Sequence, residues 1–188
     1  MKRFGRAAAV CVGVAMALSG AACGDDENAA PGGAAATFNQ ADVDFATGMI
    51  PHHEQAIEMA NLVDAQGQSA EVGALAEKIR DSQGSEITTM SGWLVAWGKP
   101  VPSPGVDGHA DHPGKMSDAE MKKLSDASGK AFDTMFLTMM VEHHEGAIAM
   151  ARDEIAKGAN AEAKELAKQI EQAQTAEIAA MRALLEES

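Results

Sequence analysis

The chain has 188 residues, with 15 Lys and Arg against 28 Asp and Glu, so its formal net charge is −13. This acidic balance argues against binding to nucleic acids and against adhesion to anionic lipid. The two cysteines, Cys11 and Cys23, both precede the part of the chain that is expected to fold, which excludes disulfides and thiolate metal ligands there.

The first 22 residues are predicted to be an export signal and not part of the fold. A basic start precedes an apolar stretch over 7–18, which is too short to span a membrane. Small residues then lead to Cys23, as in bacterial lipoprotein signals cleaved before the cysteine, although Gly20 stands where leucine is usual. We therefore expect lipidation at Cys23 and a location at the outer face of the cytoplasmic membrane or in the periplasm. Ordinary secretion with cleavage nearby is the alternative.

Residues 23–38 are rich in Ala, Gly, Asp and Pro and have no apolar period, which is typical of a flexible tether. Residues 39–188 then form one domain of about 150 residues, long enough for a substantial core. Removal of the signal would also remove three basic residues and leave a net charge of −16. That charge suits a solvated surface that attracts cations.

Helix caps, glycine stops and an apolar period of helical length predict a chain of helices, because strand signals are weak. Proline at position 51 predicts either a kink or a break near residue 50 in the first of them. The predicted helices cover 39–65, 69–97, 130–157 and 160 to the end, with a short helix opened by the Ser117–Glu120 capping box inside the crossover 98–129.

Residues 42–94 align without a gap with residues 133–185 at an offset of 91, with 23 identities in 53 positions. We interpret this as an internal duplication. Each copy is a helical hairpin whose apolar stripe needs a partner. The sequence therefore predicts an all-α fold, an antiparallel four-helix bundle built from a duplicated hairpin with a long crossover.

Each copy carries two adjacent histidines after a methionine, in the pattern Met-x-x-His-His. With about 100° per residue, the thioether and both imidazoles share one helix face above small alanines. A single His or Met on such a face is usually a core residue, but the repeated set points to a metal. Thioether and imidazole together favour Cu(I) or Ag(I) over iron, and Zn(II) on His and Glu stays open. The candidate ligands are Met49, His52, His53, Met140, His143 and His144.

A wider set of candidate metal ligands shares these faces or lies in the crossover. Glu86 and Glu177 stand on otherwise apolar faces, and a buried carboxylate needs a partner, for which a His of the facing helix would serve. The crossover histidines form either a second, exposed copper site or part of a polar loop. The wider set is Asp42, Asp133, Glu86, Glu177, Met59, Met150, His109, His112 and Met116.

The stretch 129–151 resembles the signature of the domain-of-unknown-function 305 family, through Phe132-Asp133, Met140, His143-His144 and Gly146-Ala147. Residues 112–116 resemble the family's crossover segment, although methionine often stands there at the places of His112 and Lys115. The resemblance covers about 39–187. It implies a ferritin-like bundle in an exported bacterial protein, and some members of the family are periplasmic proteins that bind copper through Met and His.

The leading hypothesis is a lipid-anchored, extracytoplasmic protein that sequesters Cu(I) or hands it to a copper chaperone or exporter. Sequestration needs no general base or nucleophile, and none is evident in the sequence. Two alternatives stay open. One is a metalloenzyme in which the His pairs with Glu86 and Glu177 hold a catalytic metal, with zinc or iron less favoured than copper. The other is a metal-free interaction domain whose histidines are structural.

Overall fold

The computed structural model describes residues 37–67, 69–103 and 112–187. The sequence predictions of an export signal, of lipidation at Cys23 and of a tether up to residue 36 fall outside the described residues, and so does His109. Across the described ranges the regular structure is entirely helical. No helix in these ranges is long and apolar enough to cross a membrane.

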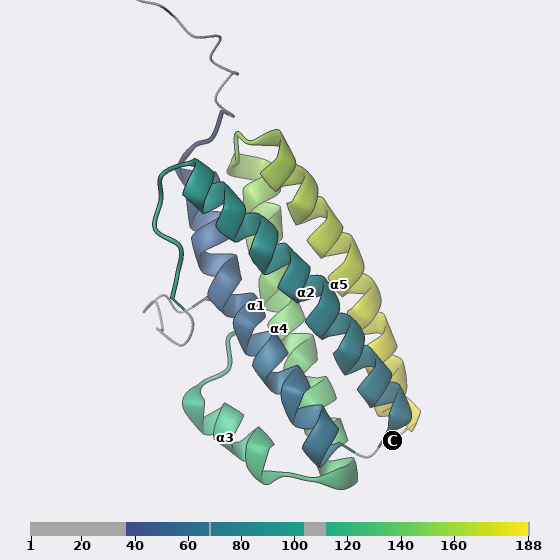
Figure 1. Ribbon diagram of the computed structural model, residues 1–188. Helices are drawn as coiled ribbons and strands as arrows, with labels where there is room; N and C mark the ends of the chain where they lie inside the picture. The colour runs from purple at the N-terminus through teal and green to yellow at the C-terminus, as the bar shows by residue number, and fades with distance from the viewer. Residues whose placement is uncertain (1–36, 68, 104–111, 188) are drawn as a thin grey trace, which may run out of the picture. The chain divides into compact units, whose positions relative to one another are not determined.

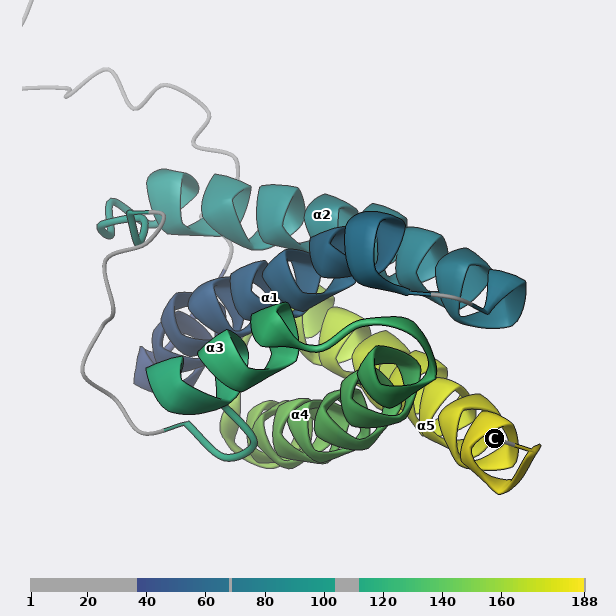
Figure 2. The same cartoon turned by 90° about the horizontal axis from the view of Figure 1, so that it is seen from below.

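The helices pack as two antiparallel hairpins, α1 with α2 and α4 with α5 (Figure 1). α1 and α4 lie against each other between the hairpins, whereas α2 and α5 make little contact (Figure 2). The predicted antiparallel four-helix bundle is confirmed. The helices are α1 (Gln40–Gln66), α2 (Ala70–Ala96), α3 (Asp118–Asp126), α4 (Gly129–Lys157) and α5 (Ala161–Glu187).

Side-chain caps explain where three of the helices begin. Asn39 accepts hydrogen bonds from two backbone N–H groups of the first turn of α1, and Asp42 accepts one from the Asn39 N–H at 2.6 Å. Ser69 caps α2, and Ser117 with Glu120 forms the predicted capping box of α3. Such caps stabilise a helix by about 1 kcal/mol each. The predicted starts of α1, α2 and α3 are therefore confirmed, and the capping residues on which the predictions were based make the expected hydrogen bonds.

α1 is continuous through Pro51, so the alternative of a helix break near residue 50 is wrong. Proline removes one hydrogen bond from the ladder of the helix. Ile50 before it and His52 after it are both buried, so packing holds the backbone on each side.

Two aspartates tie each hairpin to the turn of the other. Asp42 at the start of α1 accepts hydrogen bonds from the backbone N–H groups of Ala159 and Asn160, at 3.1 and 2.8 Å. Asp133 in α4 accepts one from the Ser69 N–H at 2.8 Å. Burial would raise the pKa of Asp42, but its backbone hydrogen bonds outweigh burial and lower it. The two carboxylates thus join the hairpins at opposite ends of the bundle.

Residues 112–116 of the crossover, called the strap below, lie directly on α1 and α4. The Gln55 amide of α1 donates to the Met116 carbonyl at 2.8 Å and accepts from the Met116 N–H at 2.7 Å. On α4, a Cβ at Gly146 would overlap the carbonyl of Pro113. Gly146 therefore lets the backbone of the strap approach the backbone of the helix.

We expect Gly146→Ala to destabilise the fold by about 1–3 kcal/mol, because the added methyl group overpacks the contact with the strap. Urea denaturation measures the change in the free energy of unfolding. Gly84→Ala in α2 is the matched control, since nothing lies within 4 Å of its Cβ position. That change should instead stabilise the helix, by up to about 1 kcal/mol. Equal effects of the two substitutions would contradict the close approach at Gly146.

Buried apolar side chains form two clusters inside the bundle. One, called the lower cluster below, lies at the end of the bundle where α4 begins and includes Phe132, Phe136 and, from α3, Leu124. The other, called the upper cluster, lies at the end where α1 begins and includes Phe45 and Leu94. Along both α1 and α4, a pair of histidines lies between the residues of one cluster and those of the other. The fold therefore places polar side chains at the middle of an otherwise apolar core.

Candidate metal centre

Four histidines of α1 and α4 form a buried layer between the two apolar clusters, called the imidazole layer below. His52, His53, His143 and His144 are all 0% exposed. His52 faces His143 across the helix contact, with ring centroids 3.8 Å apart. The rings meet because α1 and α4 are antiparallel and each carries its histidine pair near its middle. The structure therefore brings the two copies of the motif together.

Two of the imidazoles bond a carboxylate on the partner helix of their own hairpin. His53 Nε2 lies 2.6 Å from Glu86 Oε2, and His144 Nε2 lies 2.9 Å from Glu177 Oε2. Lys78 adds an ion pair to Glu177, with its Nζ 3.2 Å from Oε1. The prediction that a histidine of the facing helix partners each of these glutamates is confirmed, although only Glu177 is fully buried and Glu86 is half-buried.

The hydrogen bonds decide which ring nitrogen carries the proton. His52 Nε2 lies 3.1 Å from the Pro113 carbonyl oxygen of the strap, and a carbonyl oxygen only accepts. Carboxylates likewise accept, so His52, His53 and His144 all donate from Nε2. The Nδ1 atom of each of these three rings then carries a lone pair and is buried without a hydrogen-bond partner. Both ring nitrogens of His143 are also buried without a partner, and one of them carries the proton of the neutral ring. A buried polar atom without a partner requires an explanation.

Burial keeps the rings of His52, His143 and His144 neutral. Desolvation, with the neighbouring ring of His53, lowers the pKa of His52 to about 3. The pKa of His143 is lowered well below its usual value by burial and by His52. Burial also lowers the pKa of His144, although the hydrogen bond that its ring donates to Glu177 opposes this effect. Neutral imidazole is the form that binds a metal, so these three rings are in the metal-binding form at neutral pH.

The methionines of the two motifs lie on opposite sides of the imidazole layer. Met49 packs in the upper cluster with Ala147, and Met140 packs in the lower cluster with Ala56. Both are 0% exposed. The structure therefore places one thioether on each side of the layer and does not bring the two together.

The wider candidate set is scattered through the bundle. Among the described residues, no three His, Cys, Asp or Glu side chains are arranged to hold a metal ion. Asp42 and Asp133 lie at the hairpin turns, Met59 and Met116 pack in the lower cluster, and His112 lies beside Met150.

Glu154 of α4 is a buried carboxyl group that the sequence reasoning missed. Its side chain is 1% exposed. Burial, then the hydrogen bond and the charge of Asp42, raise the pKa of Glu154 to about 8. In the alignment at the offset of 91, Glu154 corresponds to Val63. An acidic residue at a position that is apolar in the other aligned segment was therefore the signal from which the sequence could have predicted a buried carboxyl group.

We expect the free energy of unfolding to fall as the pH rises from 6.5 to about 8. The folded state keeps a proton on Glu154, whereas the unfolded state has lost it above the usual pKa of 4.5. Glu154→Gln should remove this decline, as measured by urea denaturation at several pH values. Glu165→Gln, at an exposed position of α5, should leave the decline unchanged. A wild-type stability that is flat over this range would contradict a protonated Glu154.

The family described as "Domain of unknown function (DUF305)" matches over residues 42–185. No curated protein matches the chain. Three solved structures are similar. A DUF305 protein of Streptomyces coelicolor is 37% identical (78% of this chain, 93% of that chain, TM-score 0.72). A DUF305 fragment of Deinococcus radiodurans is 33% identical (80% of this chain, 98% of that chain, TM-score 0.72). CopM in its Cu(I)-bound form is 29% identical (78% of this chain, 96% of that chain, TM-score 0.65).

Proposed function

This chain belongs to the DUF305 family, and on that premise we propose that it is an extracytoplasmic, lipid-anchored protein that binds Cu(I) or Ag(I). The buried imidazole layer would hold the ion, with Met49 and Met140 as thioether donors on its two sides. The protein would sequester the ion or pass it to a copper chaperone or exporter.

The observation that carries this proposal is the set of unpartnered Nδ1 atoms in the imidazole layer. Histidines that bind a metal with one ring nitrogen characteristically donate the other N–H to a carboxylate or a backbone carbonyl, which fixes the ring. His53, His144 and His52 have such partners in Glu86, Glu177 and the Pro113 carbonyl. The residues around the layer therefore fit a metal better than they fit a merely structural core.

The identity of the ion rests on ligand chemistry and on a relative. Neutral imidazole and thioether are ligands that favour Cu(I) and Ag(I). Structures of CopM exist in Cu(I)-bound, Cu(II)-bound and Ag-bound forms. These findings support a soft ion for this chain, with zinc and iron as the less favoured alternatives.

The proposed location rests on the start of the chain. The basic and apolar segments before Cys23 resemble a lipoprotein signal, and the tether that follows would hold the bundle away from the membrane. The relative from Streptomyces coelicolor is described as a candidate secreted protein. Mass spectrometry of the membrane fraction would detect a diacylglyceryl group on Cys23, and Cys23→Ala should release the protein from that fraction.

A Cu(I) titration in competition with a chelator of known affinity tests the proposed binding. The protein is compared with a variant in which His52, His53, His143 and His144 are changed to Ala, and circular dichroism shows whether that variant folds. If it does not, the pair His52→Asn and His143→Asn replaces it. Tight uptake that the variant loses supports the proposal. Uptake that is unchanged in a folded variant refutes it, and absence of uptake by the wild type refutes Cu(I).

His109→Asn is the matched control, because it removes a histidine of the crossover and none of the layer. Under the proposal this variant takes up as much Cu(I) into the imidazole layer as the wild type. Steady consumption of oxygen or of a reductant by the loaded protein would instead favour the metalloenzyme alternative.

A further inference from the structure

A pocket of about 440 Å³ opens beside the upper cluster, between the first turns of α1 and the last turns of α4. The strap contributes His112 to its wall, and α4 contributes Met150 and Glu154. Asp44 and Asp153 line it as well, and both side chains are exposed. The pocket thus combines a nitrogen donor, a sulfur donor and three carboxyl groups outside the imidazole layer.

His112 and Met150 meet over the backbone of Gly48. A Cβ at Gly48 would stand 2.8 Å from His112 Cε1 and 3.0 Å from Met150 Cε. The imidazole and the end of the thioether side chain therefore occupy the space that a side chain at position 48 would fill. Burial, with a smaller effect of Lys115, lowers the pKa of His112, so its ring is neutral at neutral pH.

The corresponding groove of the other half of the bundle is apolar and covered. Six of the residues that correspond to the pocket at the offset of 91 pack in the lower cluster with Leu124 of α3, namely Phe132, Met135, Phe136, Met59, Leu62 and Val63. The apolar groove has methionine, leucine and valine side chains that pack against a helix. At the corresponding positions, the half with the pocket has a glycine and three carboxyl groups. The corresponding pairs are Gly48 and Met139, Asp44 and Met135, Asp153 and Leu62, and Glu154 and Val63.

Several of these carboxyl groups already have partners, which bears on what the pocket accepts. Asp153 pairs with Lys157 at 2.8 Å, Asp44 accepts a hydrogen bond from Gln40 at 2.7 Å, and Glu154 lies against Asp42. No three His, Cys, Asp or Glu side chains in the described ranges are arranged to hold a metal ion, so the pocket has no site for a hard cation. Imidazole with thioether is instead a donor set for a soft ion.

We propose that this pocket is a second soft-cation site, in which a ring nitrogen of His112 and the sulfur of Met150 bind one Cu(I) or Ag(I) ion. This site is separate from the imidazole layer. The two sites are adjacent along the strap, because His112 directly precedes Pro113, whose carbonyl accepts the hydrogen bond from His52. The acidic rim attracts the cation to the pocket. The proposal rests on the proposed function only for the kind of ion.

A titration with Ag⁺ tests the site, with the methionine methyl groups labelled with ¹³C and followed by NMR. Ag⁺ is diamagnetic and stable in air, and Met150→Leu assigns the Met150 signal. In the wild type the Met150 methyl signal is expected to shift at stoichiometric Ag⁺. His112→Asn should weaken this binding at least tenfold, and the four-histidine variant of the layer should leave it unchanged.

Gly48→Ala is the sharpest variant, because it removes no ligand and fills the space where the two donors meet. It should weaken Ag⁺ binding at Met150 at least tenfold while the signals of Met49 and Met140 respond as in the wild type. His109→Asn and Met135→Leu are the matched controls, since Met135 is also half-buried on α4 but lies outside the pocket. Both controls should bind as the wild type does.

Three outcomes overturn the site: a Met150 signal that does not respond to Ag⁺, a response unchanged by both His112→Asn and Gly48→Ala, or a response abolished by His109→Asn. The two proposals fail separately. Loss of the pocket response with normal uptake in the imidazole layer refutes this site alone. A normal pocket response without uptake in the layer refutes the proposed function of the layer alone.

Discussion

Acidification from pH 6.5 to roughly pH 4 is expected to destabilise the folded protein strongly, by roughly 3 kcal/mol through His52 alone. Burial lowers the pKa of His52 to about 3 in the folded state, against a usual value of 6.5. Between pH 6.5 and about pH 3, the unfolded chain binds a proton on His52 that the folded chain does not bind. The free energy of unfolding therefore decreases as the pH falls through this range.

His143 and His144 act in the same direction, because burial also lowers their pKa values. Urea denaturation at a series of pH values measures the slope, which gives the number of protons taken up on unfolding. The pair His52→Asn and His143→Asn should flatten the slope, whatever its effect on stability at pH 7. His112→Asn, at a half-buried position, should change the slope less. A slope equal in the wild type and the layer variant would contradict neutral buried rings.

Together with Glu154, these histidines predict a stability maximum near pH 6.5. Below that value the buried imidazoles destabilise the fold as the pH falls, and above it the protonated Glu154 destabilises the fold as the pH rises. Glu154 opposes the histidines between pH 4.5 and 6.5, but it is one group against three. The pH dependence of the protein is therefore set by carboxyl and imidazole groups that burial keeps uncharged.

The parts of the fold that the sequence predicted correctly depend on local interactions. Asn39, Ser69 and the Ser117–Glu120 box start helices through hydrogen bonds to their own first turns, so the pattern and the structure contain the same information. The period of the motif also placed His52 and His53 on the inner face of α1, where both are buried. Local geometry was sufficient in each case.

The parts that could not be predicted depend on contacts between distant segments. The Pro113 carbonyl accepts a hydrogen bond from His52 only because two contacts hold the strap in place. Gly146 allows the backbone of the strap to approach α4, and the side chain of Gln55 bonds the strap to α1. At the offset of 91, Gln55 and Gly146 correspond to each other, so the two aligned segments differ where the crossover passes over them. The pairing of His112 with Met150 has the same origin, since it requires the bare backbone of Gly48.

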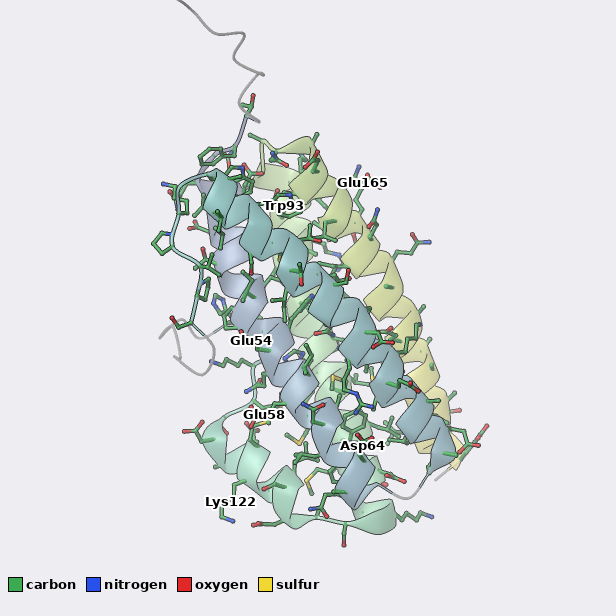
Figure 3. The ribbon with its side chains drawn as sticks, in the orientation of Figure 1. Glu54, Glu58, Asp64, Trp93, Lys122 and Glu165 are labelled. Atoms are coloured by element: carbon green, nitrogen blue, oxygen red, sulfur yellow. The ribbon has the colours of Figure 1, made fainter. Side chains whose placement is uncertain are left out.

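The side chains at the surface contrast with this interior. The labelled Glu54, Glu58, Asp64 and Lys122 project from the outside of the helices in Figure 3, and an acidic sequence predicts such a solvated surface. Arg80 pairs with Asp64 at 3.3 Å and Lys122 pairs with Asp126 at 2.7 Å. Exposed pairs of this kind contribute little to stability.

Replacement of both Glu86 and Glu177 by alanine is expected to weaken binding of Ag⁺ or Cu(I) in the imidazole layer by about 100-fold or more. Removal of a hydrogen-bond partner behind a metal-binding histidine typically costs about 10- to 100-fold in affinity, because the ring loses its orientation and basicity. Here each carboxylate holds Nε2 of one ring, at 2.6 Å for His53 and 2.9 Å for His144. Competition titration of each single variant and of the double variant measures the loss.

The two glutamates should differ in what their removal does to the fold. Glu177 is 4% exposed and also bonds Lys78, whereas the Glu86 side chain is 17% exposed. Glu177→Ala leaves a buried N–H without a partner, at about 1–3 kcal/mol of stability, while water reaches the place of Glu86 more easily. Glutamine at either position keeps an acceptor and should recover most of the stability but less of the affinity. Glu77→Gln, an exposed control on α2, should change neither. If the alanine variants lost stability but kept full affinity, the glutamates would serve the fold alone, and the imidazoles would not bind the metal through Nδ1.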